Sequence, residues 1–322
     1  MARVLVTGGA GFIGSHLCDR LVADGHDVVG LDDLSTGDRR HLAGVLGHPR
    51  FALRIHDVIE PFTEEVDAIY HLACPASPVH YQRDPVRTLR TCVEGTLRAL
   101  MCAHAVGARL VLASTSEVYG DPSEHPQRES YLGNVNPIGP RACYTEGKRG
   151  AEALAASYAR QHGVDVRIAR IFNTYGPRMP RGDGRVVANF VEQAQAGQAL
   201  TVHGDGGQTR SFCYVDDLID GVVALMALPP GPRGVVAPIN LGNPSEITVG
   251  ELAALVCELA GSPSPITRVD RPVDDPARRC PDITLARRLL GWAPTVGLRD
   301  GVQRTLRQAE VVEPGNPVRP LV

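Results

Sequence analysis

Short apolar runs alternate with longer amphipathic stretches through the first half of the chain. Runs of mostly apolar residues predict buried β-strands, whereas apolar residues spaced three and four apart predict helices. Strands that alternate with helices pair in parallel and carry helices on both faces, so the predicted fold class is α/β with a doubly wound parallel sheet. The predicted strands are residues 3–7, 26–32, 51–55, 68–72, 109–113 and 165–171, and the predicted helices are 13–23, 85–106 and 144–161.

After about residue 174 the pattern becomes shorter and less regular. Glycine and proline interrupt it at 176–185, 203–208 and 228–234, and helical spacing returns at 217–227, 248–260 and 284–290. We therefore expect a main domain at 1–174, whose sheet can gain elements from later in the chain. A smaller region at 175–312 and a loosely held tail at 313–322 would follow.

Composition excludes several classes of protein. The 322 residues are 43% hydrophobic and 21% charged, as in ordinary globular proteins. A net charge of −3 without a basic stripe argues against a nucleic-acid partner, and no apolar run suits a membrane span. The first predicted strand begins at residue 3, so a targeting peptide is not expected. Eight scattered cysteines without a C-x-x-C pair favour reduced thiols in a cytoplasmic protein, with no metal site.

A glycine-rich turn, TGGAGFIGSHL, joins the first strand to the first helix through Gly8, Gly11 and Gly14. Glycines let a backbone approach a pyrophosphate, whose charge the helix N-terminus stabilises. Asp32 ends the next strand, 24 residues after Gly8, where a carboxylate binds an adenosine ribose and repels a 2′-phosphate. The pattern predicts a dinucleotide site that prefers NAD to NADP. Asp57, with Val58 beside it, either contacts the adenine or only ends the third strand.

Lys148 is the only lysine among 33 basic residues, and it stands four residues after Tyr144. At this spacing both side chains lie on one helix face. A tyrosine that acts as a base near neutral pH needs its phenolate stabilised, which a nearby ammonium does. The compact ammonium can also bond ribose hydroxyls, in a space that the planar fork of arginine fills differently. The alternative is a solvated lysine on a helix surface.

A third polar group ends a central predicted strand in the segment LASTSEVYG, residues 112–120. Ligands of open α/β sheets bind at the carboxyl ends of the strands. Thr115 and Ser116 offer hydroxyls there and Glu117 offers a carboxylate, unless Glu117 only caps a helix or belongs to a loop.

Longer segments show a resemblance to a known family. HLACPASP, LASTSEVYGDP, NPIGPRACY followed by EGKR, RIFNTYGPRM, DGRVVANF, GQTRSFCYVDDL and NLGNPSE closely resemble the UDP-glucuronic acid decarboxylases, or UDP-xylose synthases. These enzymes belong to the extended short-chain dehydrogenase/reductase superfamily, and the likeness runs from about residue 3 to 308. It implies an NAD-dependent, redox-neutral decarboxylation of UDP-glucuronic acid to UDP-xylose through a UDP-4-keto sugar.

The resemblance also implies roles for the residues noted above. Tyr144 would take the proton from the sugar O4′, Lys148 would lower the Tyr144 pKa and hold the nicotinamide ribose, and Thr115 would bond O4′. Glu117 would assist ring handling or proton delivery near C5′, with Ser116 as a further donor. The carboxylate of the 4-keto sugar is β to the ketone, so carbon dioxide leaves easily. Arg279 would bind that carboxylate through two guanidinium N–H groups, unless it is a surface residue beside Asp274 and Asp275.

The two ligands define the expected binding residues. Residues 1–174 would form the NAD-binding Rossmann domain and 175–312 mainly the nucleotide-sugar-binding region. Arginine side chains form charge-assisted hydrogen bonds with a diphosphate. The chain has 32 arginines, however, so any single one of them can instead be an ordinary surface residue. NAD binding is expected at Gly8, Gly11, Phe12, Ile13, Gly14, Asp32, Leu34, Thr36, Gly37, Asp57, Val58, Leu72, Ala73, Thr91, Tyr144, Lys148, Thr174 and Arg178. UDP-sugar binding is expected at Tyr81, Arg90, Asn173, Arg185, Val187, Thr201, Arg210, Arg271 and Arg279.

Three positions depart from the family pattern. Thr145 replaces the usual aspartate, DDLSTG after the second strand is in the style of UDP-galactose 4-epimerases, and Cys280 stands where lysine is common. The main alternative activity is that of a UDP-glucuronic acid 4-epimerase giving UDP-galacturonic acid, which Glu117 and Arg279 disfavour. A 4,6-dehydratase would need an acid at position 116. A non-catalytic NAD-sensing protein would typically lose the tyrosine or the lysine.

Extended members of the superfamily commonly form homodimers through a bundle of two long helices from each subunit. The predicted helices 85–106 and 144–161 are the candidates here, unless they pack only within their own chain. The contacts expected are Leu97, Leu100, Met101, Leu154 and Tyr158.

Overall fold

A parallel sheet of seven strands forms the centre of the protein, in the order β11-β6-β5-β4-β1-β2-β3. The computed structural model describes residues 1–230 and 237–311, so the predicted tail and part of the segment 228–234 lie outside the described residues. The strands of the sheet are β1 (Arg3–Thr7), β2 (Asp27–Asp32), β3 (Phe51–Ile55), β4 (Ala68–His71), β5 (Arg109–Thr115), β6 (Val166–Ile171) and β11 (Ile239–Leu241). The predicted fold class is confirmed, and β11 adds a strand from beyond residue 174.

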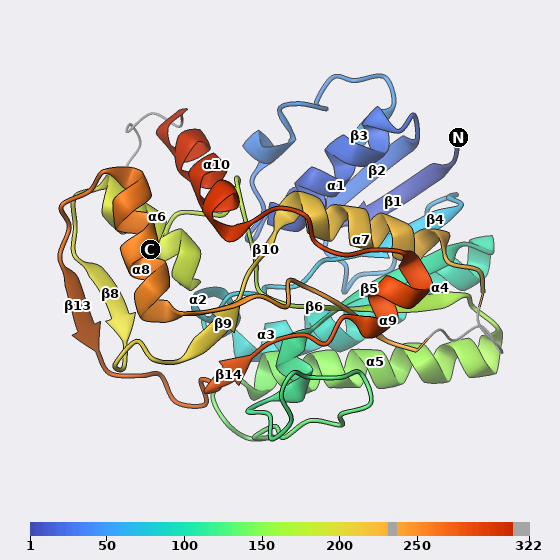
Figure 1. Ribbon diagram of the computed structural model, residues 1–322. Helices are drawn as coiled ribbons and strands as arrows, with labels where there is room; N and C mark the ends of the chain where they lie inside the picture. The colour runs from blue at the N-terminus through green and yellow to red at the C-terminus, as the bar shows by residue number, and fades with distance from the viewer. Residues whose placement is uncertain (231–236, 312–322) are drawn as a thin grey trace.

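Helices cover both faces of this sheet because its strands are apolar on both sides (Figure 1). Val4 and Val6 of β1 pack into the cluster that includes α1 (Phe12–Ala23) and α7 (Val215–Ala227). Leu5, between them in sequence, points to the opposite face, towards α4 (Thr96–Val106) and α5 (Ala142–His162). This alternation is the period of two expected of strands, and burial on both faces explains the nearly continuous apolar runs.

The predicted helix 85–106 is one continuous helical stretch with a change of pitch in its middle. It consists of α3 (Pro85–Arg90), a π-helical turn η2 (Thr91–Gly95) and α4. Such single π turns occur frequently at functional sites. Leu100 of α4 is fully buried within the chain's own core, so the expectation that it contacts a partner subunit is wrong.

Part of the C-terminal region, residues 186–203 and 249–269, forms a smaller lobe beside the sheet, at the left of Figure 1. Helix α8 begins with a capping box, in which Thr248 and Glu251 each bond the other's backbone N–H. The sequence patterns predicted α7, α8 and α9 but not α6 and α10. The remaining elements are α2 (Pro78–Tyr81), α6 (Val186–Gln195), α8 (Val249–Ala260), α9 (Thr284–Leu290), α10 (Leu298–Val311), β7 (Thr174–Tyr175), β8 (Leu200–His203), β9 (Thr209–Ser211), β10 (Cys213–Tyr214), β12 (Glu246–Thr248), β13 (Ile266–Val269), β14 (Arg278–Arg279) and the 3-10 turns η1 (Arg39–Leu42) and η3 (Ser116–Tyr119).

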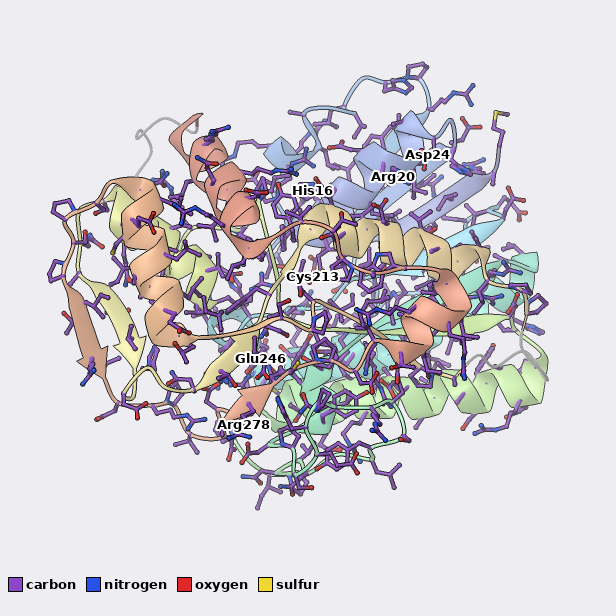
Figure 2. All side chains as sticks on the ribbon, viewed as in Figure 1. His16, Arg20, Asp24, Cys213, Glu246 and Arg278 are labelled. Carbon is purple, nitrogen blue, oxygen red and sulfur yellow. The ribbon has the colours of Figure 1, made fainter. Side chains whose placement is uncertain are left out.

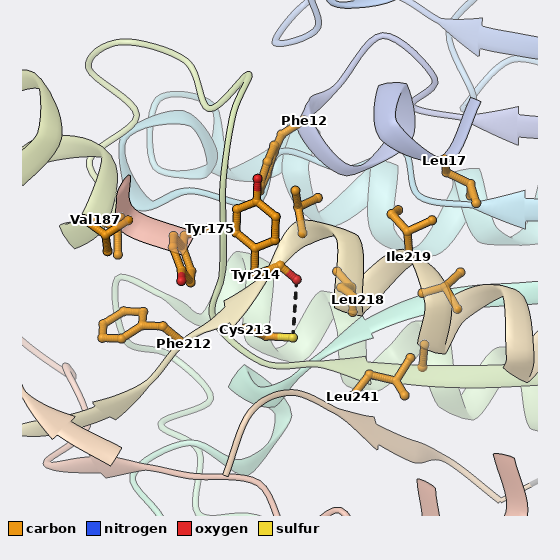
Figure 3. Packing of buried hydrophobic residues seen from close by; sticks show 14 of the residues in the cluster. Phe12, Leu17, Tyr175, Val187, Phe212, Cys213, Tyr214, Leu218, Ile219 and Leu241 are labelled. Carbon is orange, nitrogen blue, oxygen red and sulfur yellow. Dashed lines mark hydrogen bonds between the residues drawn. The ribbon is translucent and has the colours of Figure 1, made fainter. Parts of the chain in front are cut away.

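Buried aromatic side chains join this lobe to the sheet domain (Figure 3). The Tyr175 ring lies edge-on to Phe212, with 6.4 Å between ring centroids, and to Tyr214, at 5.7 Å. Phe12, at the first turn of α1, and Val187 of α6 belong to the same cluster. One continuous core therefore links the helix after the glycine-rich turn to the start of the smaller lobe.

The outer helices carry charged side chains, as Figure 2 shows for Arg20 of α1, near Asp24 at the end of this helix. Their ion pair spans one turn, with Arg20 Nε 2.9 Å from Asp24 Oδ2. None of the helices in the described ranges is long and apolar enough to cross a bilayer.

Candidate active site

An open cleft of about 490 Å³ runs along the carboxyl ends of the central strands and continues between the sheet domain and the smaller lobe. This is the edge at which open α/β sheets bind their ligands. Most of the predicted site residues line it, namely Gly8, Gly11, Phe12, Ile13, Gly14, Asp32, Thr36, Asp57, Val58, Leu72, Ala73, Thr91, Thr115, Ser116, Glu117, Tyr144, Lys148, Asn173, Thr174, Arg185, Val187, Thr201, Arg210 and Arg279.

Glycine is required at two positions of the turn that opens the cleft. Gly8 has φ +71°, and a Cβ on it would lie 2.9 Å from the backbone N of Ala73. A Cβ on Gly14, in the first turn of α1, would lie 1.9 Å from the carbonyl oxygen of Gly8. The turn and the helix therefore pack backbone against backbone, which leaves room at the helix N-terminus for a bulky anionic group.

Asp32 stands at the other side of this turn with its carboxylate almost fully buried. Its Oδ2 accepts a hydrogen bond from the backbone N of Ala10 at 2.9 Å, and its Oδ1 accepts one from that of Leu34 at 2.8 Å. Gly37 also lies against it, since a Cβ there would be 2.7 Å from Oδ1. Burial raises the pKa of Asp32, although these backbone donors oppose the rise. The glycine turn and this held carboxylate together fit an NAD molecule.

The side chain of Asp57 is already engaged by the protein. Its Oδ2 lies 2.7 Å from Nη2 of Arg87, and its Oδ1 accepts from the backbone N of Ile59 at 3.1 Å. Arg87 also binds Asp33 Oδ2 at 2.9 Å, and all three charged residues line the cleft. Nothing in the local sequence pattern pointed to Arg87, because its partners come from the ends of two other strands.

Six predicted site residues do not line the cleft. Leu34 and Gly37 contact the Asp32 carboxylate, as described above. Tyr81 is fully buried and stacks on Tyr144, with 5.1 Å between the ring centroids. The other three are engaged as follows: Arg178 binds Asp19, Arg90 pairs with Glu94 at the exposed surface of the chain, and Arg271 donates to the backbone oxygen of Asp275.

Tyr144 and Lys148 lie on one face of α5, buried against the end of β5. Lys148 Nζ donates to the backbone oxygen of Ala113 at 2.8 Å and lies 6.0 Å from the centre of the Tyr144 ring. Lys148 is only 5% exposed, so it is not a solvated surface lysine. Gly147 lets the helix approach the π turn, because a Cβ there would meet the Cβ of Cys92 at 2.9 Å.

The surroundings of Tyr144 keep its hydroxyl protonated. Burial is the largest influence and, with the negative charge that Cys74 contributes, raises the pKa of Tyr144 well above its ordinary value. The neighbouring Thr115 side chain acts in the opposite direction. The free protein therefore holds Tyr144 as a phenol, and a base at this position needs additional positive charge close to it.

Glu117 joins two arginines at the far end of the cleft. Its carboxylate accepts from Arg141 Nη2 at 2.6 Å and 2.8 Å and from Arg279 Nη1 at 2.7 Å. Burial alone would raise the pKa of Glu117, but the charges of Arg279 and Arg141 lower it to about 2. Glu117 is therefore an ionised carboxylate at neutral pH, held in place by two guanidinium groups.

Asp275 extends this network into the smaller lobe. It lies 3.5 Å from Arg141 Nη1 and 2.8 Å from Arg210 Nη2, while Arg271 is bonded to its backbone. Burial, and then the positive charge of Arg279, lowers the pKa of Arg210 to about 10. Three arginines that line the cleft (Arg141, Arg210 and Arg279) face two carboxylates (Glu117 and Asp275), which leaves a formal excess of one positive charge among these groups.

Arg141 is a further cleft residue that the sequence analysis did not single out. It lies three residues before Tyr144 within the segment NPIGPRACY, so the residue order alone could have indicated it. Two departures from the family pattern prove structurally mild. Thr145 donates to the backbone oxygen of Arg141 at 3.2 Å, and the Cys280 thiol donates to that of Pro244 at 3.3 Å.

Comparisons with known proteins agree with this geometry. The model of the NAD dependent epimerase/dehydratase family matches residues 4–241. The chain is 55% identical to UDP-glucuronic acid decarboxylase 1 of Xenopus tropicalis over 304 residues, which cover 94% of this chain and 71% of that protein. It is 56% identical to UDP-glucuronic acid decarboxylase 3 of Arabidopsis thaliana over 301 residues, covering 93% and 86%.

Solved structures share the whole fold. The UDP-glucuronic acid 4-epimerase of Bacillus cereus, in complex with UDP-glucuronic acid and NAD, superposes with a TM-score of 0.85 at 27% identity, covering 97% of this chain and all of that one. DesIV of Streptomyces venezuelae, a dTDP-glucose 4,6-dehydratase with NAD and TYD bound, gives a TM-score of 0.86 at 32% identity, covering 96% and 97%.

Proposed function

This chain belongs to the NAD dependent epimerase/dehydratase family, and we propose that it decarboxylates UDP-glucuronic acid to UDP-xylose through a UDP-4-keto sugar, with no net redox change. The observation that carries the choice of reaction is the 55–56% identity to UDP-glucuronic acid decarboxylases over nearly the whole chain. The UDP-glucuronic acid 4-epimerase shares the fold at only 27% identity.

NAD bound in the cleft would supply the hydride acceptor for C4′ of the sugar and the hydride donor after decarboxylation. The glycine-rich turn between β1 and α1 would hold its pyrophosphate, and the Asp32 carboxylate would bind its adenosine ribose. Lys148 reaches its second ribose with the ammonium group that also bonds Ala113. The preference for NAD follows because a 2′-phosphate would place a second anion against the buried Asp32 carboxylate.

Tyr144 takes the proton from the sugar O4′. Its phenol is buried and its pKa is raised in the free protein, where the side chain of Thr115 opposes the rise. The positive charge of Lys148 favours the phenolate as well. Thr115, at the end of β5, donates to or accepts from O4′ and so aligns the hydroxyl with the base. Tyr81 stacks on Tyr144 and keeps the ring in one orientation.

The arginine cluster receives the carboxylate of the sugar. Arg279 binds it with its fork, and Glu117 restrains Arg279 and Arg141 in the position where the carboxylate arrives. Carbon dioxide then leaves because its bonding electrons move into the 4-ketone to form an enolate. Glu117 is ionised at neutral pH and has no proton to give. We therefore assign the delivery of a proton at C5′ to the Ser116 hydroxyl.

Arginines and an amide along the cleft bind the UDP portion. Arg185 and Asn173 line the wall shared with the smaller lobe, and Arg210 lies beside Asp275. An arginine beside a diphosphate forms charge-assisted hydrogen bonds, and the excess of positive charge in this part of the cleft attracts the diphosphate, which carries two negative charges.

The product mass tests the proposal directly. The purified protein is incubated with UDP-glucuronic acid, with and without added NAD, and the nucleotide sugars are separated and weighed by mass spectrometry. We expect a product lighter by one carbon dioxide. A product of unchanged mass would assign the chain to the epimerases instead.

The homodimer expected from the sequence is part of the proposal, through the outer faces of α4 and α5. Met101 of α4 is 45% exposed, and the rings of Tyr158 and His162 on α5 lie 4.3 Å apart, tilted by 41°. Light scattering after gel filtration tests this, and Met101→Glu should shift a dimer towards the monomer. The cytoplasm is the proposed compartment, supported by eight cysteines without a disulfide.

A further inference from the structure

Two thiols lie in contact beside Tyr144 and Lys148. The Sγ of Cys74, in the loop after β4, is 3.2 Å from the Sγ of Cys92, in the π-helical turn η2. Cys74 lines the cleft, whereas Cys92 is buried beneath it. The two residues are 18 positions apart and belong to different elements, so the fold alone brings them together.

The other cysteines have different surroundings. The chain's eight cysteines all lie within the described residues, and Cys74 and Cys92 are the pair whose sulfur atoms contact each other. Cys74 also donates to the backbone oxygen of Pro75 at 3.4 Å. Each of the remaining thiols donates to such an oxygen, namely Cys18 to Gly9, Cys102 to Glu64, Cys143 to Tyr81, Cys213 to Tyr214, Cys257 to Ser264 and Cys280 to Pro244.

We propose that Cys74 and Cys92 are an oxidation site, at which a peroxide forms a disulfide that reversibly lowers the activity of the enzyme. The sulfur atoms are about 1.2 Å further apart than the ~2.05 Å of a disulfide bond, so a small shift closes the bond. Cys74 is the sulfur that a peroxide in the cleft reaches first. In support, the hydrogen bond from Cys92 and the charge of Lys148 lower the pKa of Cys74.

The chemistry balances with one peroxide per disulfide. The Cys74 thiolate attacks a peroxide oxygen, the O–O bond breaks, and Cys74 becomes a sulfenic acid while one water is released. The Cys92 sulfur then attacks the sulfenic sulfur, the S–O bond breaks, and a second water leaves with the thiol proton. Two electrons pass from the two thiols to the peroxide, and a dithiol reductant reverses the change.

The position of the pair explains the loss of activity. Ala73, next to Cys74, packs against Gly8, where a Cβ would be only 2.9 Å from its backbone N. On the other side, the Cys92 Sγ lies 3.0 Å from where a Cβ on Gly147 would be, one residue before Lys148. Formation of the disulfide therefore displaces either the loop at Ala73, which borders the NAD site, or the helix that carries Tyr144. A displacement of about 1 Å at reacting groups can cost ~10²-fold in rate.

Peptide mapping tests the site without reference to activity. Reduced protein is treated with hydrogen peroxide, the remaining thiols are alkylated, and the digest is analysed by mass spectrometry. We expect one linked peptide pair containing Cys74 and Cys92, with the six other cysteines alkylated, and no such pair in Cys92→Ala. Cys257→Ala, a change at a partly exposed thiol on α8, should leave the linkage intact. Alkylation of all eight cysteines, or a bridge from Cys74 to Cys143, would overturn the proposal.

Activity then tests the consequence, and this arm rests on the proposed function. Each protein is compared with its own reduced form, and we expect turnover of the oxidised enzyme to fall at least tenfold and to recover with dithiothreitol. Cys92→Ala should not show the recoverable loss. If the disulfide is mapped but the oxidised enzyme keeps full activity, the oxidation site stands and the proposal that it lowers activity is refuted. If no UDP-glucuronic acid is consumed even by the reduced protein, the proposed function fails and the mapping result still stands.

Discussion

Replacing Glu117 by glutamine removes the carboxylate that holds Arg141 and Arg279 together. The pKa of Glu117 is about 2, against 4.5 for an ordinary glutamate. At about 1.4 kcal/mol for each tenfold difference in protonation, the ion pairs contribute on the order of 3 kcal/mol to folding at neutral pH. Breaking a buried ion pair by removing one partner costs a similar ~3–5 kcal/mol. We expect Glu117→Gln to lower the free energy of unfolding by about 3 kcal/mol at pH 7.5.

The dependence on pH has a definite sign. The folded-state pKa of Glu117 is depressed, so its contribution is fully present above about pH 4.5 and is lost as the pH falls from there towards 2. The difference between wild type and Glu117→Gln should be constant between pH 7.5 and 5.5 and should shrink below 4.5. Denaturant titrations monitored by circular dichroism and tryptophan fluorescence measure it at each pH.

A matched control comes from an exposed glutamate with an arginine partner. Glu258 pairs with Arg299, and their side chains are 60% and 58% exposed. Solvent screens such a pair, so Glu258→Gln should leave the unfolding curve unchanged. The reasoning about the buried network is refuted if Glu117→Gln is no less stable than this control at pH 7.5.

Four further outcomes follow from the geometry of the cleft. Lys148→Arg should keep the fold and lose at least ~100-fold in turnover, measured as initial rates of UDP-xylose formation, because a planar guanidinium cannot replace the buried ammonium; near-full activity would contradict this. Tyr144→Phe should abolish turnover while calorimetry still detects UDP-glucuronic acid binding, and retained activity would remove Tyr144 from the mechanism. NAD should raise the melting temperature more than NADP does, and equal shifts would contradict the role given to Asp32. Gly14→Ala would place a methyl group 1.9 Å from the carbonyl oxygen of Gly8, so we expect weaker NAD binding in equilibrium dialysis, with unchanged affinity as the contrary result.

Elements with strong local patterns were predicted closely. The strand 3–7, the helix 284–290 and the extended helix that carries Tyr144 agree with β1, α9 and α5 to within two residues at each end. Helix α10 was missed, although its amphipathic sequence covers the smaller lobe, and β11 has only three residues. Short segments like β11 are stabilised by their neighbour in the sheet rather than by their own sequence.

The sequence by itself predicted the glycine-rich turn and the Tyr144–Lys148 pair of the candidate site, because each of these signals lies within a short segment of the chain. Gly8 to Gly14 occupy one turn, and Tyr144 and Lys148 share one helix face, so spacing along the chain implies proximity in space. Only the tertiary structure decided what surrounds them. Glu117, Arg141 and Arg279 meet across 162 residues of sequence, and Cys74 meets Cys92 across two elements. Such contacts depend on the paths of loops and the packing of helices against the sheet, which no local spacing encodes.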